Sequence, residues 1–399
     1  MSESVVIFKD FMRLALFFYK TIGIDPCEPN DISGAVKFWH YFNFLLNLGN
    51  LNFGIICEIV YVVRAFKNNE HFIEAIMMLS CMGYSLVGEC KMISGWRQKT
   101  KLSELVQQLE NMFPSQQQEH QRHYKVHRYL RLCRLVTRGF SGMYVLLIAT
   151  YSLGGIIIYF VLWPNGERTL PYTPYAPWDW HDNWTFYPLY VSQAIAGFTA
   201  TSGHISSDVM IYAVLTQVIM HFDYLATSFE SYTIQAVDLK DRHSKNMQEL
   251  QAKIIYHNKL LDFVDAINVI FGVPLLLNFF ASSVGICFLG FQMSIGLSPE
   301  MGIKVAFFLA SSLVQIYLIC YFSQLLIDAS ANISTAVYNA DWSGADVRYR
   351  KMLILIAQRA QRPVNLKATI FLDVSMWTMT EFVQMSYKFF ALLRTLYRI

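Results

Sequence analysis

The sequence predicts an all-α membrane protein with seven transmembrane helices, an inside N-terminus and an outside C-terminus. Three observations lead to this fold class. Of the 399 residues, 54% are hydrophobic and only 15% are charged, whereas a soluble chain carries about 25% charged residues. Seven apolar runs are long enough to cross a bilayer, which takes about 20 residues of helix. Lys and Arg gather in alternate connecting segments, as they do in cytoplasmic loops.

The chain starts with a cytoplasmic segment, residues 1–37, in which we find no cleavable signal peptide, so the first helix is expected to insert uncleaved. Its run FKDFMRLALFFYK has helical spacing and is expected to lie at the membrane surface. Apolar length then predicts the spans in order. They are residues 38–63, 71–94, 139–163, 187–219, 268–293, 302–328 and 369–395.

The distribution of basic residues predicts the orientation. The segments 1–37, 95–138, 220–267 and 329–368 hold 24 of the 32 Lys and Arg residues, which places all four on the cytoplasmic side. Asn183 starts the glycosylation sequence Asn183-Trp184-Thr185 in the outer segment before the fourth span, so we expect a glycoprotein. The second such sequence, at Asn332, lies inside and should stay unmodified.

The inner segments carry helical patterns of their own. Residues 222–232, 250–268 and 348–361 place apolar side chains at steps of three and four, as in helices that pack on one another. They predict a compact inner base suited to contact between subunits.

The chain offers no chemistry for catalysis. It contains no Gly-rich phosphate loop, nucleophile elbow or zinc-protease motif. His120, His123 and His127 have helical spacing but lie among Gln and Arg residues without a carboxylate or Cys, which favours a solvated basic helix over a metal site. We therefore expect no enzyme activity, cofactor, metal or nucleic-acid partner.

Charged and polar residues inside the spans are informative because an ionised side chain in hydrocarbon is costly. Glu89 and Lys91 lie near the inner end of the second span, where their side chains are expected to reach the membrane surface. Asp208 is expected to cap or to pair with a neighbouring helix. His204 either faces a pocket or bonds a backbone carbonyl.

The outer halves of spans two, three, four and six mix aromatic, small and hydroxyl side chains. This mixture predicts a pocket for a small apolar ligand with one or two hydrogen-bond partners, although ordinary helix packing uses the same residue types. The candidate ligand-binding residues are Leu79, Met82, Tyr151, Gly154, Phe198, Thr201, Ser202, Phe307, Ser311 and Val314.

The seventh span is apolar but interrupted by charges. On a helix, Glu381, Gln384, Lys388 and Thr395 share one stripe, and an apolar stripe of Phe382, Phe389, Leu392 and Leu396 lies beside it. A polar stripe on a membrane helix indicates a water-filled path.

Three stretches of the chain resemble the insect odorant receptors. They are YLICYFSQLL at 317–326, RKMLILIAQRAQRPVNLKA at 350–368 and SYKFFALLRTL at 386–396. The resemblance implies a tetrameric ligand-gated cation channel with a split seventh helix, in the plasma membrane of olfactory sensory neurons. It implies three parts after the N-terminal segment: a six-helix bundle with the outer-half pocket (38–347), a cytoplasmic anchor helix (348–368), and a pore helix with an extracellular tail (369–399).

The same resemblance gives roles to the stripe residues. The gate would lie at Leu392 and Leu396, with Thr395 between them, and a ring of apolar side chains is a sound gate because it excludes water. Phe389, Lys388, Gln384 and Glu381 would line the path below. Small volatile odorants, permeant cations and membrane lipid are the implied partners.

The short inner segment between spans four and five resembles that of tuning subunits, which pair with a shared co-receptor subunit in a heterotetramer. Lys388 is consistent with a heterotetramer. In a homotetramer four copies of this lysine would converge in the pore and repel the permeant cations. The alternatives are a G-protein-type receptor and a gustatory-type channel subunit. The tail of gustatory receptors begins with Thr-Tyr and has Gln-Phe seven residues further on. The corresponding positions here are Lys388-Phe389 and Thr395-Leu396, so this chain departs from the pattern at all four. A transporter would require paired repeats, which are not visible.

Overall fold

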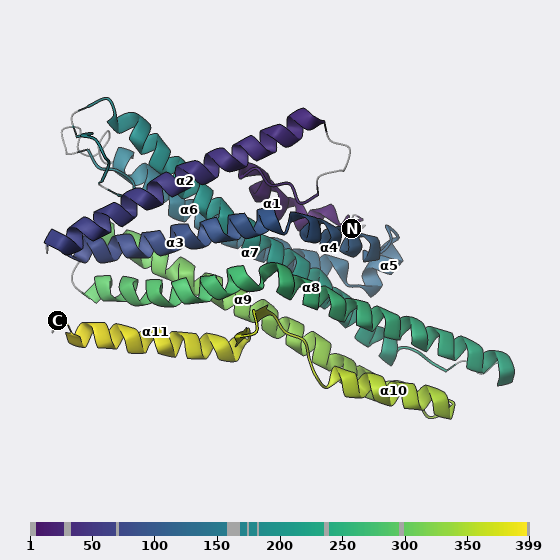
Figure 1. Cartoon of the computed structure of the whole chain (residues 1–399). Coiled ribbons are helices and arrows are strands. Elements are labelled where there is room, and N and C mark those ends of the chain that lie inside the picture. The colour runs from purple at the N-terminus through teal and green to yellow at the C-terminus, as the bar shows by residue number, and fades with distance from the viewer. Residues whose placement is uncertain are drawn as a thin grey trace.

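The computed structural model describes residues 5–27, 33–68, 72–157, 168–173, 175–181, 183–234, 239–294 and 299–396. These residues are almost entirely helical, as predicted (Figure 1). The elements are α1 (Lys9–Thr21), α2 (Gly34–Asn68), α3 (Phe72–Arg97), α4 (Lys99–Met112), α5 (Gln118–His123), α6 (Val126–Ile157), α7 (Phe186–Glu230), α8 (Leu239–Ser294), α9 (Pro299–Asn339), α10 (Val347–Ala360), β1 (Lys367–Ala368), β2 (Leu372–Asp373) and α11 (Met376–Leu396).

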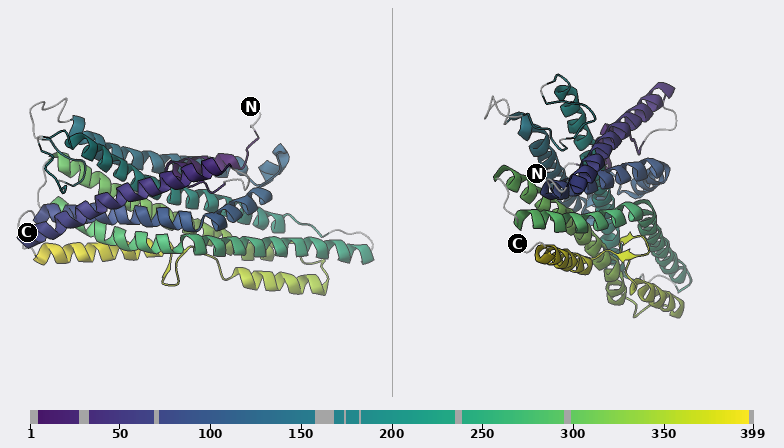
Figure 2. Two further views of the ribbon diagram at one scale, coloured as in Figure 1. Left: turned by 45° about the horizontal axis from the view of Figure 1, so that its top comes forward. Right: turned by 60° about the vertical axis from the view of Figure 1, so that its left-hand side comes forward.

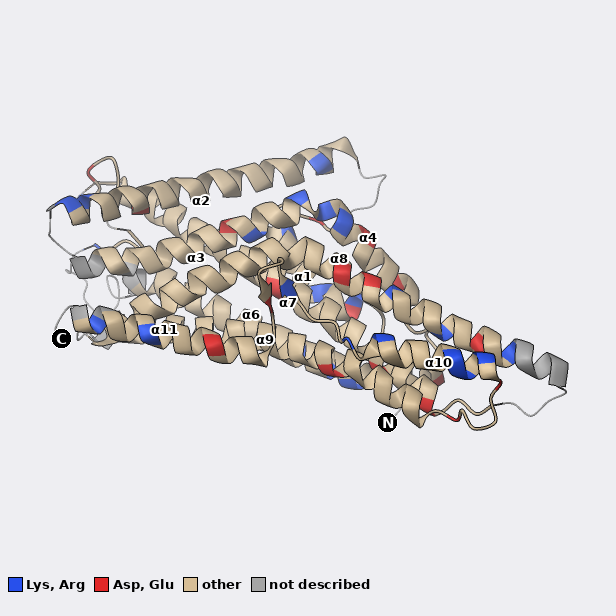
Figure 3. Cartoon of the chain, turned by 60° about the horizontal axis from the view of Figure 1, so that its bottom comes forward, with Lys and Arg blue, Asp and Glu red and all other residues tan. Residues whose placement is uncertain are grey.

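The predicted spans fall on α2, α3, α6, α7, α8, α9 and α11, although 158–163 of the third span lie outside the described residues. Among the described helices, α2, α6, α7, α8 and α9 are long and apolar enough to cross a membrane by length and composition. The long helices run side by side, with α4, α5 and α10 at one end and the C-terminus at the other (Figures 1 and 2). Charged residues gather over the end that holds α4 and α10 (Figure 3).

Helix α7 is the axis of the bundle. Its 45 residues are buried without interruption from Thr199 to Phe222. It packs against α9, α6, α1, α3 and α2, so most of the membrane core is built around it. The other candidate spans bury 28–39% of their most apolar stretch inside the protein, against 89% for α7. They therefore keep a broad apolar face for lipid, and α7 does not.

Two glycines let α3 approach α7 closely. A Cβ atom at Gly88 would lie 2.6 Å from the carbonyl oxygen of Ala200, and one at Gly203 would lie 2.5 Å from the carbonyl oxygen of Gly88. Small residues at such a crossing are how membrane helices bring their backbones together. The close approach brings polar side chains of the two helices within bonding distance.

The structure corrects the expectation for the N-terminal run. Helix α1 does not present its apolar stripe to a membrane surface, because Phe11, Met12, Ala15, Phe18 and Tyr19 are buried in the protein. It packs on α7 and α6. A Cβ atom at Gly95 would lie 3.0 Å from the Tyr19 ring, so the glycine leaves room for that ring.

The seventh helix is split, as the resemblance implied. Helix α10 packs on α9, and α11 packs on α8 and α9. The predicted start of the membrane half at 369 is wrong, because β1 and β2 form an antiparallel hairpin there and Thr369 has a positive φ of 65°. Ser323 of α9 holds the hairpin, since its Oγ donates to the carbonyl of Val374 at 2.6 Å and accepts from the amide of Leu366 at 3.1 Å.

Candidate functional site

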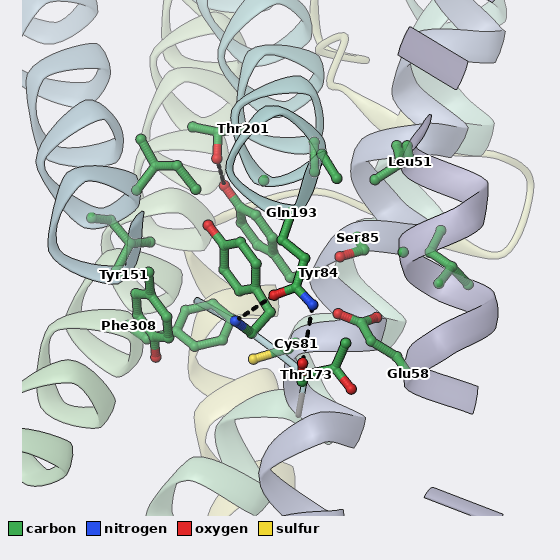
Figure 4. A pocket seen from close by; sticks show the side chains of 18 residues that line it. Leu51, Glu58, Cys81, Tyr84, Ser85, Tyr151, Thr173, Gln193, Thr201 and Phe308 are labelled. Carbon is green, nitrogen blue, oxygen red and sulfur yellow. Dashed lines mark hydrogen bonds between the residues drawn. The ribbon is translucent and has the colours of Figure 1, made fainter. Parts of the chain in front are cut away.

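A cavity of about 60 Å³ lies among the outer halves of α2, α3, α6, α7 and α9. Apolar and aromatic side chains make most of its wall, and a few polar groups interrupt them (Figure 4). The lining residues are Leu51, Gly54, Ile55, Glu58, Cys81, Tyr84, Ser85, Leu147, Ile148, Tyr151, Tyr172, Thr173, Gln193, Ala196, Gly197, Ala200, Thr201 and Phe308. A cavity of about 150 Å³ lined by apolar groups binds benzene. A ligand of that size would therefore have to push these walls apart.

The segment before α7 covers one side of the cavity. Gln193 of α7 ties it down, because its Nε2 donates to the carbonyl of Thr173 at 3.0 Å and its Oε1 accepts from the amide of Tyr172 at 3.2 Å. The Tyr172 hydroxyl lies 3.2 Å from that of Ser152. The Tyr172 ring also stacks on Tyr151, with centroids 6.0 Å apart. These contacts hold residues 172 and 173 of the segment in place as a lid over the cavity.

Tyr84 connects the cavity to the interior of the bundle. Its hydroxyl donates to Thr201 at 3.0 Å, and its ring meets Phe308 edge-on at 5.5 Å. The other face of the ring stacks on His204 at 4.2 Å, and Nε2 of His204 lies 3.0 Å from the carbonyl of Tyr84. Of the two roles considered for His204, the backbone carbonyl bond is observed, and the ring also lines a second cavity of about 30 Å³.

A buried ion pair lies just below His204. Lys91 Nζ lies 2.7 and 2.9 Å from the two carboxylate oxygens of Asp208, and both side chains are fully buried. Gln315 of α9 donates to the same carboxylate at 2.5 Å. The expected pairing of Asp208 is confirmed. The expectation that Lys91 reaches the membrane surface is wrong, because the α3–α7 crossing places its ammonium group against Asp208.

The structure brings two of the ten candidate pocket residues, Tyr151 and Thr201, into the cavity wall. Leu79, Met82, Gly154, Phe198, Ser202, Phe307, Ser311 and Val314 are not among the lining residues. Phe198 and Val314 are exposed on the outside of the bundle, whereas Ser202 and Ser311 are buried elsewhere. On α3 the lining positions are Cys81, Tyr84 and Ser85, which differ from Leu79 and Met82 by the rotation of the helix.

Sequence reasoning missed the wall that α2 contributes. Leu51, Gly54, Ile55 and Glu58 line the cavity from this helix. The signal was available, because Glu58 is a carboxyl group in the middle of an apolar span and such groups face a cavity or a partner. Gln193 carried a similar signal on the fourth span.

Helix α11 lies at the edge of the chain and exposes the predicted stripe. Glu381, Gln384, Lys388, Leu392 and Thr395 are exposed, and Phe389 is 50% exposed. Only the helix position of Leu396 is described. The buried face of α11 is that of Phe382, whose ring meets Phe279 of α8 edge-on at 5.9 Å. The stripe is therefore free to face other subunits or water.

Asn183 is exposed and lies three residues before the start of α7. Its accessibility suits the predicted modification.

A family model described as "7tm Odorant receptor" matches residues 71–387. Odorant receptor 67a of Drosophila melanogaster is 41% identical over 99% of this chain and 98% of its own length. Odorant receptor 85c of the same organism is 43% identical over 97% of this chain and 99% of its own length. The solved structure of the insect olfactory receptor OR5 from Machilis hrabei in complex with eugenol matches with a TM-score of 0.82 at 15% identity, covering 97% of this chain and 98% of that one. This last likeness concerns the fold alone.

Proposed function

The chain belongs to the odorant receptor family, and from this premise we propose that it is the odorant-binding subunit of a heteromeric odorant-gated cation channel. The proposal places it in the plasma membrane of olfactory sensory neurons, in a tetramer with a co-receptor subunit. The observation that carries the proposal is the combination of a cavity with aromatic walls and a polar stripe exposed on α11.

Helix α9 supplies a physical connection between the cavity and the proposed pore helix. Phe308 lines the cavity, Gln315 bonds Asp208, and Ser323 holds the hairpin before α11. Each of these residues is about two helical turns from the next, on the same side of α9, and the three span a rise of about 22 Å. A displacement of Phe308 by a ligand would therefore act on the base of α11 through a single rigid helix.

The small volume of the cavity explains how a bound ligand could change the conformation of the protein. A ligand that exceeds about 60 Å³ separates the cavity walls when it binds. It stabilises whichever arrangement of α9 accommodates it, and the equilibrium shifts by the difference in affinity between the two arrangements. In the proposed channel the expanded arrangement is the conducting one.

On this proposal the pore path carries Glu381, Gln384, Lys388 and Phe389, with the gate at Leu392 and Leu396. The division implied by the resemblance remains a proposal: a bundle over 38–347, an anchor part over 348–368 and a pore-lining part over 369–399, whose helix begins at Met376. The outer surface of α10 supports a role in subunit contact, since Val347, Ile354 and Leu355 are exposed apolar residues.

Expression in oocytes tests the function. Odorant-evoked cation current is expected when the chain is expressed with a co-receptor subunit, and little or none is expected from the chain alone. A full current from the chain alone would refute the tuning-subunit role. A response that requires added G proteins, with an Ile399 tag reached only after permeabilisation, would support a G-protein-type receptor instead.

The cavity is tested by Tyr151→Ala, which removes an aromatic wall and enlarges the space. We expect the order of preferred odorants to move toward bulkier molecules. Phe198→Ala is the matched control, because Phe198 is exposed on the outside of the same region of the bundle. An unchanged order in Tyr151→Ala would place the odorant elsewhere.

A further inference from the structure

Glu58 is an unusual feature of the cavity wall. It lies on α2 and is 5% exposed. Its Oε2 atom is buried and has no hydrogen-bond partner. Among the described residues with such an unpartnered buried atom, Glu58 is the one that lines this cavity. Figure 4 shows its carboxyl group directed into the cavity, on the side of Gln193 and Ser85.

Three other polar side chains of the wall already have partners within the protein. Both polar atoms of the Gln193 side chain are used by the lid, and the Tyr84 hydroxyl donates to Thr201. The Tyr172 hydroxyl is paired with Ser152. A ligand that bonded these groups would have to break bonds the protein already makes. Glu58 requires no such exchange.

A buried carboxyl group without a partner is unfavourable, and the cost is greatest when it is ionised. Buried ion pairs elsewhere in this bundle are complete, as with Lys91 and Asp208. No salt bridge to Glu58 occurs among the described residues. The α3 side chains that share the cavity with it are Cys81, Tyr84 and Ser85, and none of them is cationic. The partner that Glu58 lacks is therefore one that a ligand can supply.

We propose that Glu58 binds the single polar group of the odorant and that this group is a hydroxyl, so the preferred ligands are small alcohols or phenols. This inference rests on the proposed odorant-binding function. A hydroxyl both donates and accepts a hydrogen bond, so it pairs with a carboxyl group whether or not that group is ionised. A carbonyl oxygen can only accept, and an ammonium group can only donate.

The rest of the ligand fits the rest of the wall. Tyr84, Tyr151 and Phe308 present aromatic surface, and Leu51, Ile55 and Leu147 present aliphatic surface. A mostly apolar pocket with one convergent polar group orients a small molecule by that group. Glu58 thus fixes which end of the odorant faces α2.

The test uses the chain coexpressed with its co-receptor and matched sets of probes on one carbon skeleton. Each set contains an alcohol, a ketone or aldehyde, an amine and a hydrocarbon, for example benzyl alcohol, benzaldehyde, benzylamine and toluene. Alcohols are expected to be the strongest agonists. Glu58→Leu is expected to raise the half-maximal concentration for the best alcohol about 10-fold or more, equivalent to about 1.4 kcal/mol, and to leave hydrocarbon agonists unaffected.

Glu58→Gln keeps shape and hydrogen bonding, so the alcohol response should shift by less than that of Glu58→Leu. Glu89→Gln is the matched control, because Glu89 lies outside the cavity and accepts a bond from Asn52 at 2.7 Å. Surface labelling confirms that each variant reaches the membrane, and Glu58→Ala, which also removes the carboxyl group, replaces Glu58→Leu if that variant does not.

Two outcomes would overturn the inference while leaving the channel function standing. One is an odorant-evoked current whose alcohol sensitivity is the same in Glu58→Leu as in the unaltered chain. The other is a ranking led by amines or by carbonyl compounds across the sets. A complex that reaches the surface but gives no odorant-evoked current would instead contradict the proposed function itself.

Discussion

Replacing Asp208 with asparagine would leave the Lys91 ammonium group in the centre of the bundle without its counter-charge. The two side chains are fully buried and joined at 2.7 and 2.9 Å, and Gln315 adds a third bond to the carboxylate. Removing one partner of a buried pair typically costs about 3–5 kcal/mol, because the remaining charge stays desolvated. Since whole proteins are stable by only about 5–15 kcal/mol, this loss is a large fraction of the total.

The assay is the thermal stability of the detergent-solubilised protein, followed by fluorescence-detected size exclusion after heating. At about 2–4 °C per kcal/mol for domains of 150–250 residues, Asp208→Asn should lower the melting temperature by at least about 6 °C. The double variant Lys91→Met with Asp208→Leu removes both charges and should recover most of the loss. Glu89→Gln, at a partly exposed carboxyl group, is the control with little expected effect.

An Asp208→Asn protein that melts within about 2 °C of the original, a change of 1 kcal/mol or less, would refute the reasoning. So would a double variant that is as unstable as the sum of its single variants. Either result would mean that water or another residue compensates the Lys91 charge.

Three further predictions concern the crossing, the outer segment and the pore. Gly88→Ala should destabilise the protein by about 1–3 kcal/mol, because the new Cβ atom would lie 2.6 Å from the Ala200 carbonyl oxygen. Gly83→Ala on the same helix is the control in the same melting assay. It should be tolerated, because its Cβ atom would meet no atom within 4 Å. Asn183→Gln should abolish a glycosidase-sensitive shift in gel mobility, and Asn332→Gln should not. Lys388→Gln should raise cation conductance in the heteromer by removing a like charge from the path, and an unchanged single-channel conductance would take Lys388 out of the pore.

Much of the fold could be predicted from the sequence because membrane insertion depends on local properties. Apolar length and the placement of Lys and Arg are read directly along the chain, and each predicted span overlaps a helix in the described residues. The central position of α7 was not predicted. Its signal, a 45-residue helix with small, polar and apolar residues on every side, becomes meaningful only once the neighbours that cover it are known.

The site was harder to predict because it depends on helix rotation. A shift of two positions on α3 separates Leu79 and Met82 from the lining residues Cys81 and Tyr84. The periodicity of apolar residues identifies the buried face of an amphipathic helix. Helix α3 is apolar on all sides, so its sequence does not show which face lines the cavity. The burial of α1 had the same difficulty, because an amphipathic helix suits a lipid surface and a protein groove equally well.

The central position of α7 also constrains the order in which the protein can assemble. Helix α7 is synthesised after α3 but before α9, so Asp208 can meet Lys91 while Gln315 has yet to be made. The close glycine crossing and the ion pair can therefore form an early α3–α7 pair in the bilayer. Helices α8 and α9 would then pack onto α7, and α11 onto α8 and α9, after the charge of Asp208 has been neutralised by Lys91. Until α8 and α9 have been synthesised, the side of α7 that they cover is therefore exposed to the bilayer or to other proteins.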